Sequence, residues 1–353
     1  MLNIMIVFSI IAGIDKIWNN KFALGEKFDE GFLALPGLAL TIIGIYTLSP
    51  LIGKLLIHIL GPLAKLMGSD TSVFISSILA PDLGGLPTSQ AIANTKLVGE
   101  FNGALLSSML GTTISFTIPV AVGIISKDDF KFFAKGALAG IITIPIGIIV
   151  SGILMGVGFK DMIFNLIPVL VFSGLTVLGL TKSQDKMIEL FGILGNIIIK
   201  ISTLGLILSI INFMFGIEII SGMLPFEEAA LIVFEIAIIL SGAYSLFYLI
   251  STKLHKYISR IGDKYKLDQY SILGIFSSLA NCIPMFGIYD KMNEKGKVIN
   301  AAFVVSGAFV FGGQLGYVSS SLPHVTNAFI VGKLVAGISS IVVASLMMKK
   351  QNN

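Results

Sequence analysis

Long apolar stretches recur along this 353-residue chain, and short segments holding most of the charged residues separate them. Stretches such as 2–14, 33–48, 231–250 and 328–348 reach or approach the roughly 20 residues that an α-helix needs to cross a bilayer. Only 12% of the residues are charged, whereas about 25% are charged in a typical soluble domain. The pattern predicts an all-α polytopic membrane protein in contact with a lipid bilayer, and residues 1–14 are expected to form a permanent helix.

The chain resembles itself when it is shifted by about 198 residues. The runs that match are 28–31 with 226–229, 44–48 with 242–246, 75–80 with 276–280, 102–104 with 300–302, and 138–141 with 335–338. Because these matches follow one another in order at nearly one offset, composition is a poor explanation for them. We predict a first repeat at 1–158, a linking transmembrane helix at 159–185 and a second repeat at 186–353.

Each predicted repeat contains an apolar segment that proline and glycine interrupt, at about 71–96 and about 270–296. The interruptions are the runs 81–87 and 281–287, and each flanking arm has about half the length needed to cross. Such segments leave backbone groups without helical partners, which favours re-entrant hairpins over spanning helices. About eleven apolar segments then become about nine transmembrane helices plus two re-entrant hairpins.

Lysine placement predicts the orientation, because cytoplasmic loops carry the excess of Lys and Arg. The basic loops around 16–27, 127–135, 253–266 and 291–297 fall on one side only if both hairpins turn back and the N-terminus lies outside. The C-terminus is then cytoplasmic, and the second repeat enters the membrane upside down relative to the first. Inverted repeats with broken elements near the midplane are typical of secondary transporters.

Asp82 is the sharpest candidate for a site, because a carboxylate at the tip of an apolar hairpin is costly and is expected to face a cavity, a partner or an ion. Next to Gly84 and Gly85, it lies where unwound carbonyls can surround a ligand, and its charge suits a cation. The alternative interpretation is that Asp82 caps the second arm or lies at the membrane surface. Asn281 and Pro284, at the tip of the second hairpin, belong to the same candidate binding site.

The helices after the hairpins are interrupted near Thr112 and Thr113 and near Gln314. Their hydroxyl and amide groups can line a pathway, although small polar residues also serve ordinary helix packing. Glu235 lies within an apolar run and is a candidate for ion or proton coupling, or simply reaches the headgroups. Lys200 and Lys333, which also fall within spans, can neutralise such acids.

Several function classes find no support in the sequence. The three histidines, His58, His255 and His324, have no metal-ligand spacing, and no phosphate-binding loop, HExxH or GxSxG motif is present. The lysines lie in short loops rather than along one face, which gives no sign of a nucleic-acid partner. We therefore expect no catalytic residues, no metal and no cofactor, and we do not expect an enzyme.

The chain resembles the ethanolamine permease family of bacterial ethanolamine-utilisation gene clusters. The resemblance covers nearly the whole length and is clearest at 25–32, 82–85, 107–125, 281–286 and 296–310. It implies uptake of ethanolamine, a small and mostly protonated aminoalcohol, across the bacterial cytoplasmic membrane. The chain departs from the family pattern at Gly313-Gln314, where an Asp-His pair is expected.

We predict a permease for ethanolamine or a closely similar small amine that works by alternating access with the hairpins as gates. In this hypothesis Asp82 binds the ammonium group, and Thr112, Thr113 and Gln314 bind the hydroxyl group. The alternatives are the same fold with another small polar metabolite as cargo, or a membrane sensor or enzyme that binds an amine without moving it. A homodimer is one assembly that the sequence allows.

Overall fold

The computed structural model describes residues 2–349, and that part of the chain is helical with no β-strand. Residue 1 and residues 350–353, the outer ends of the two predicted repeats, lie outside the described residues. Several side chains between 180 and 191 and most between 251 and 265 also lie outside them, including most of the basic side chains of the loop at 253–266. The predicted all-α class is confirmed.

Seven helical segments in the described chain are long and apolar enough to cross a membrane. They are Leu24–Met67, Lys96–Ile124, Phe130–Met155, Phe159–Gly179, Gly192–Phe215, Phe226–Ile250 and Pro323–Met348. Two of the nine predicted crossings fall short of this length, because α1 has 16 residues and the helix after the second hairpin is divided into α14 and α15. The chain is a multi-pass membrane protein, while the count of nine stays a prediction.

The first half of the chain contains a broken segment followed by an irregular helix. Its elements are α1 (Leu2–Ile17), α2 (Leu24–Leu33), α3 (Leu35–Met67), α4 (Ser72–Ile78), η1 (Pro81–Leu83), α5 (Gly85–Ile92), α6 (Lys96–Phe101), the π-helical η2 (Asn102–Gly111) and η3 (Thr113–Thr117), α7 (Ile118–Ile124) and α8 (Phe130–Met155). The link is α9 (Phe159–Lys182).

The second half follows the same order of long helices, broken segment and interrupted helix. Its elements are α10 (Gln184–Phe215), α11 (Phe226–Tyr265), α12 (Gln269–Ala280), α13 (Cys282–Gly287), η4 (Tyr289–Lys291), α14 (Glu294–Gly307), α15 (Gly313–Ser321), η5 (Pro323–Val325) and α16 (Thr326–Lys349). Both segments predicted to be broken are broken, and in each the two arms contact one another. That they turn back within a membrane stays a prediction.

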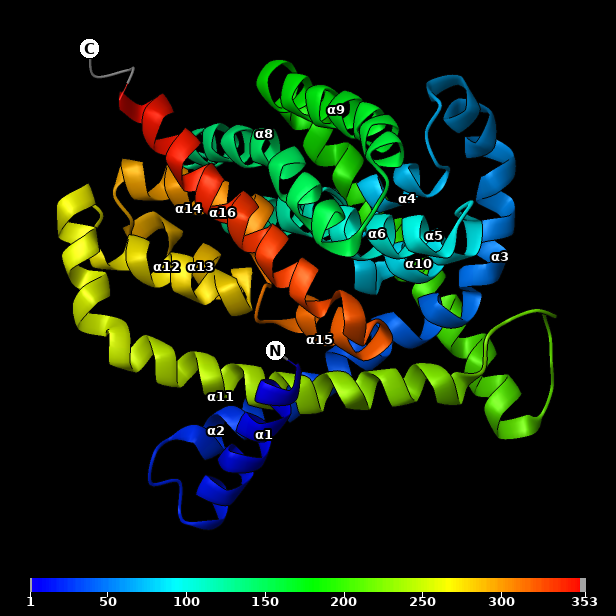
Figure 1. Cartoon of the computed structure of the whole chain (residues 1–353), viewed down its shortest axis with the longest axis horizontal. Coiled ribbons are helices and arrows are strands. Elements are labelled where there is room, and N and C mark those ends of the chain that lie inside the picture. Colours follow the sequence, from blue (N-terminus) through cyan, green and yellow to red (C-terminus); the bar gives the residue numbers. More distant parts are fainter. Residues whose placement is uncertain (1, 350–353) are drawn as a thin grey trace.

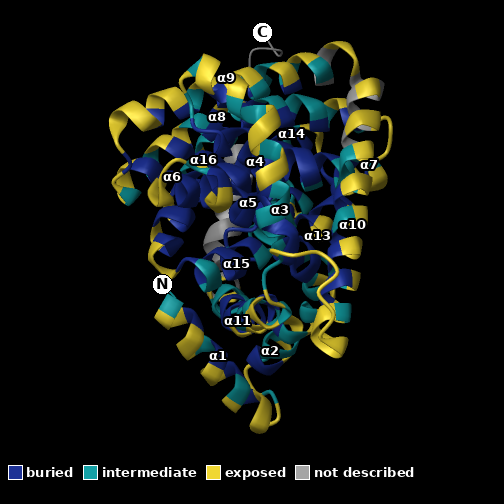
Figure 2. Cartoon of the chain, turned by 90° about the vertical axis from the view of Figure 1, so that its right-hand side faces the viewer, coloured by how far each residue is buried: buried dark blue, intermediate teal, exposed yellow. Residues whose placement is uncertain are grey.

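The helices form a bundle whose centre contains the broken segments (Figure 1). The helices α8, α14 and α16 pack against one another, whereas α1 and α2 pack against α11 and project from one end (Figure 2). Outer helices expose apolar side chains, among them Leu170, Leu175 and Leu178 of α9. Because contact with lipid tails costs an apolar side chain little, this surface suits a bilayer.

Candidate functional site

The tip of the first hairpin is a tight turn that carries Asp82 between α4 and α5. Gly84 has φ of +94°, a conformation that L-residues rarely adopt. A Cβ atom on Gly85 would lie 1.9 Å from Ser107 Oγ, so only glycine fits there without a shift of its surroundings. Both glycines are buried, and neither lines a cavity that contains Asp82. They shape the turn that presents the carboxylate, and their place in the binding site stays a prediction.

A cavity of about 440 Å³ lies where the two hairpin tips meet the interrupted helices. A volume of this order is typical of sites for small molecules, which span roughly 300–1,000 Å³. Its lining comes from α2 and α3, the tips of both hairpins, the interruptions of both irregular helices, and α11. The lining residues are Leu33, Ala34, Gly37, Leu38, Thr41, Ala80, Asp82, Leu83, Phe116, Leu240, Tyr244, Ala280, Asn281, Phe309, Gly313 and Gln314.

Among the described residues, Asp82 is the only acidic one on this lining. Its Oδ1 atom is buried and has no hydrogen-bond partner among the described residues. A buried carboxylate oxygen without a partner is costly, so such groups are normally satisfied. A cation bound in the cavity would satisfy it.

Aromatic rings form much of the remaining wall. The rings of Phe116 and Phe309 pack edge to face with their centroids 5.7 Å apart, and Tyr244 lies on the same lining. Phe309 has φ of +61°, which is an outlier for a bulky residue and is the kind of strain that clusters at functional sites. Its amide donates to Ser278 O at 2.9 Å, which fixes the interrupted helix against the second hairpin.

A chain of hydrogen bonds runs behind the cavity from one interrupted helix to the other. Gln314 Nε2 donates to Thr112 Oγ1 at 2.6 Å, and Lys333 Nζ donates to Gln314 Oε1 at 2.7 Å. Thr113 does not join this chain, because its hydroxyl donates to Met109 O and to Val305 O at 2.8 and 3.0 Å. The structure thus places Gln314 in the cavity, Thr112 behind it and Thr113 in a helix contact.

A second cavity of about 430 Å³ shares Tyr244, Ala280 and Asn281 with the first. Asn281 caps α13 by accepting a hydrogen bond from the Ile283 amide at 2.9 Å, and Pro284 lines only the second cavity. The predicted Asn281 therefore lies between the two cavities. The second cavity extends to Lys27 and Glu30 of α2, which form an ion pair.

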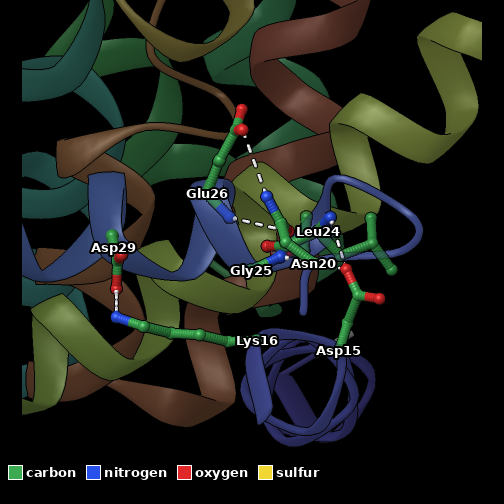
Figure 3. A network of polar contacts seen from close by, with 8 residues as sticks. Asp15, Lys16, Asn20, Leu24, Gly25, Glu26 and Asp29 are labelled. Carbon is green, nitrogen blue, oxygen red and sulfur yellow. Dashed lines mark hydrogen bonds and ion pairs between the residues drawn. The ribbon is translucent and has the colours of Figure 1, made fainter. Parts of the chain in front are cut away.

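The start of α2 is held in place by a polar network at the end of α1 (Figure 3). The Asp15 carboxylate accepts hydrogen bonds from the amides of Phe22, Leu24 and Gly25 at 3.0, 2.9 and 3.2 Å. Helix N-terminal amides lack partners within the helix and favour negative charge, so Asp15 caps α2 from a neighbouring element. An ion pair between Lys16 and Asp29 adds a second tie (Figure 3). These hydrogen bonds and this ion pair position α2, which lines both cavities.

The chain matches the family described as "Ethanolamine utilisation protein, EutH" over residues 1–347. It belongs to the EutH family. A relative named "Probable ethanolamine permease EutH" from Listeria monocytogenes is 41% identical, over 98% of this chain and 94% of that protein. The Salmonella typhimurium protein of the same name is 33% identical, over 99% of this chain and 95% of its own length.

A third relative is the Bacillus subtilis protein named "Uncharacterized protein YxeR", which is 37% identical over 99% of this chain and 94% of its own length. No solved structure matches the chain. The family resemblance predicted from the sequence is thus confirmed. The names of the Listeria and Salmonella relatives describe permeases and not enzymes, in agreement with our expectation that this EutH-family chain is not an enzyme.

Glu235 lies apart from the candidate site. It is partly buried on α11, accepts a hydrogen bond from Ser320 of α15, and lines neither of the two cavities. Its role in ion or proton coupling stays a prediction, and the contact with α15 gives it a structural role.

Sequence reasoning missed the aromatic lining of the cavity and underrated Lys333. The repeated runs 44–48 and 242–246 contain Tyr46 and Tyr244, so the duplication itself was a signal for Tyr244. No sequence signal distinguished Phe116 and Phe309 from the other phenylalanines, because their place in the cavity depends on the two interrupted helices meeting.

Proposed function

We propose that the chain is a permease that carries protonated ethanolamine, or a closely similar small amine, across a membrane by alternating access. The observation that supports this most is the buried Oδ1 atom of Asp82, which lines a cavity of suitable size and has no partner among the described residues. An ammonium group can donate a charge-assisted hydrogen bond to this oxygen, and such bonds are among the strongest in proteins. The names of the relatives, which contain ethanolamine, agree with this chemistry.

The rest of the cavity suits the other features of an aminoalcohol. The amides of Asn281 and Gln314 supply polar groups for a hydroxyl, and both residues lie on the same lining as Asp82. The rings of Phe116, Phe309 and Tyr244 add cation–π attraction for the ammonium group. Thr112 supports the hydroxyl indirectly, because its own hydroxyl accepts the hydrogen bond from Gln314.

Equivalent contacts in the two halves support the proposed repeats. Asp70 accepts from the Ser72 amide at 2.9 Å and from the Asn94 amide at 2.8 Å, which closes the base of the first hairpin. Asp268 accepts from the Ser271 amide at 2.9 Å and from the Asn293 amide at 2.7 Å, which closes the base of the second. The two aspartates are separated by the offset found in the sequence, and the sequence comparison had not singled them out. Each hairpin is therefore fixed at its base by an equivalent aspartate.

Peripheral helices of each half pack against peripheral helices of the other half. In the first half α3 packs against α10, and in the second α11 packs against α1. A Cβ atom on Gly44 would lie 1.8 Å from Ser202 O of α10, and one on Gly242 would lie 1.8 Å from Met5 O of α1. This reciprocal packing supports two inverted repeats at 1–158 and 186–353, linked by 159–185. Such repeats meeting at a central site are an arrangement suited to alternating access.

Uptake of labelled ethanolamine into liposomes that contain the purified protein tests the proposal. Saturable uptake that unlabelled ethanolamine competes away is the expected result, because a charged and partly enclosed site holds a limited number of ligands. Ethylamine, which lacks the hydroxyl, should compete more weakly, and ethylene glycol, which lacks the charge, should compete least. Uptake that is indifferent to ethanolamine would point to another cargo, and binding without flux would point to a sensor.

The orientation completes the proposal. We place the protein in the bacterial cytoplasmic membrane with the N-terminus outside and the C-terminus in the cytoplasm, as the lysine distribution predicts. The second cavity, which extends to Lys27 and Glu30, then lies on the cytoplasmic side of Asp82. A membrane-impermeant maleimide should then label an engineered thiol near residue 20 in inverted membrane vesicles but not in intact cells, which checks this orientation.

A further inference from the structure

Lys333 on α16 is a buried cation next to the proposed site. Its side chain is 1% exposed, and its Nζ atom donates to Ser108 O at 2.6 Å and to Gln314 Oε1 at 2.7 Å. The ammonium lies 5.2 Å from the centroid of the Phe329 ring. These acceptors are neutral, and within the described part of the chain no acid lies in ion-pair contact with it. Burying a charge without an ion pair is expensive, so a role beyond packing is expected.

The two interrupted helices supply the acceptors for Lys333. In a regular α-helix the Thr112 amide would bond to Ser108 O, but in the π-helical stretch it donates to Ser107 O and Met109 O instead. Ser108 O is then available to Lys333. The second acceptor, Gln314, lies in the first turn of α15, directly after the interruption of its own helix. The irregularity of both helices thus creates the place where this cation sits.

Lys333 is coupled to the cavity in two ways. Gln314, which accepts its hydrogen bond, lines the cavity together with Asp82. Lys333 and Asp82 also attract each other electrostatically. When both groups are ionised and no ligand is bound, the negative charge of Asp82 and the positive charge of Lys333 balance. The chain carries a tethered alkylammonium group, which is chemically the same group as the proposed cargo.

We propose that Lys333 is the internal counter-ion that allows the empty carrier to return, an inference that depends on the proposed function. Without its charge the empty site carries an uncompensated carboxylate, and moving that charge through an apolar protein interior during the return step is costly. In such a variant the loaded carrier does not have this problem, because the bound ammonium takes the place of the lost Lys333 charge and neutralises Asp82. Loss of the Lys333 charge should therefore slow the return of the empty carrier and spare the movement of the loaded one.

The experiment compares net uptake with exchange in proteoliposomes. Net uptake into empty vesicles requires the empty carrier to return, whereas exchange of outside labelled for inside unlabelled ethanolamine does not. Lys333→Met removes the charge and the hydrogen bonds, and Lys333→Gln removes the charge but keeps an amide donor. For both variants we expect net uptake to fall by more than about tenfold, the effect of about 1.4 kcal/mol in a barrier, while exchange stays within about twofold of the unsubstituted protein.

Lys200→Gln is the matched control, because Lys200 also lies within a long apolar helix but its side chain is exposed. It should leave both net uptake and exchange unchanged. Net uptake by Lys333→Gln at the rate of the unsubstituted protein would overturn the proposal, as would an equal loss of exchange and net uptake. Failure of both Lys333 variants to fold, while the Lys200 variant folds, would show a purely structural lysine and also overturn it. Absence of ethanolamine flux in the unsubstituted protein would instead contradict the proposed function itself.

Discussion

Replacing Asp82 with asparagine removes one negative charge from the cavity and nearly preserves the shape of the side chain. The hairpin tip should keep its structure, because the turn depends on Gly84 and Gly85 and on the hydrogen bond of 2.9 Å from the Gly85 amide to Ala80 O. The Oδ1 atom of Asp82 has no partner among the described residues, so the substitution breaks no side-chain hydrogen bond at that atom. The variant therefore tests the charge and not the fold.

The size of the effect follows from the contact that an ammonium group would lose. A hydrogen bond to a charged group contributes about 1.5–3 kcal/mol, and two unit charges about 4 Å apart attract by about 4 kcal/mol where the effective dielectric constant is about 20. The nearby charge of Lys333 opposes an incoming cation and reduces the gain. We expect a net loss of about 2–3 kcal/mol, which corresponds to about 30- to 160-fold weaker ethanolamine binding, at 1.36 kcal/mol for each factor of ten.

The measurement is the concentration of ethanolamine that gives half-maximal uptake in proteoliposomes, together with direct binding to the purified protein. Asp161→Asn is the control, because Asp161 is an exposed carboxylate in the first turn of α9, away from the cavity. The control should behave like the unsubstituted protein. If Asp82→Asn binds and transports ethanolamine with unchanged constants, the carboxylate is not the ammonium partner and the proposed site is wrong.

Three further predictions concern the two hairpins. Gly85→Ala should lower the free energy of unfolding by about 1–3 kcal/mol, because its Cβ atom would meet Ser107 Oγ at 1.9 Å; Gly174→Ala, whose Cβ atom meets nothing within 4 Å, is the control in thermal unfolding, and equal melting of both variants would refute the packing argument. Partial burial alone would raise the pKa of Asp268, but hydrogen bonds from Asn293 and Ser271 outweigh it and hold the pKa below its ordinary value of 3.8. Asp268 therefore stabilises the folded state above that value and loses this effect as the pH falls through the lowered pKa. The stability difference between Asp268→Asn and the unsubstituted protein should then shrink as the pH falls below the ordinary value of 3.8; a constant difference would contradict the assignment. Cys282 is fully buried at the tip of the second hairpin, so a membrane-impermeant maleimide should label it slowly, and ethanolamine should change that rate if the tip moves; labelling that is fast and unaffected by substrate would exclude the gate.

Much of the architecture followed from the order of residues along the chain. The apolar runs predicted helices, and the prolines and glycines at 81–87 and 281–287 predicted where two of them break, because backbone geometry at these residues is a local property. The repeated runs likewise predicted that the halves share one order of elements. The number of long membrane-spanning helices differs from the number predicted, because the sequence does not show what conformation each interrupted helix adopts. The first continues through π-helical turns, and the second unwinds at 308–312.

For the candidate site, composition and pattern singled out Asp82, Asn281 and Gln314, which the tertiary structure brings to one cavity. The same pattern also singled out Thr113 and Pro284 for substrate binding and Glu235 for coupling, and only the structure separates them from that cavity. Whether a polar group deep in a membrane helix faces a ligand, a neighbouring backbone or another side chain depends on the rotation and packing of helices far apart in sequence.

The sequence by itself determined that the chain is an apolar, helical membrane protein with a carboxylate at a broken tip, and it predicted an internal duplication. The tertiary structure alone decided that this carboxylate shares a cavity wall with Gln314 and that Lys333, more than 200 residues from Ser108, donates to both interrupted helices. The physical reason is that hydrophobic periodicity and backbone propensity act between near neighbours, whereas a buried charge selects its partners by proximity in the folded chain.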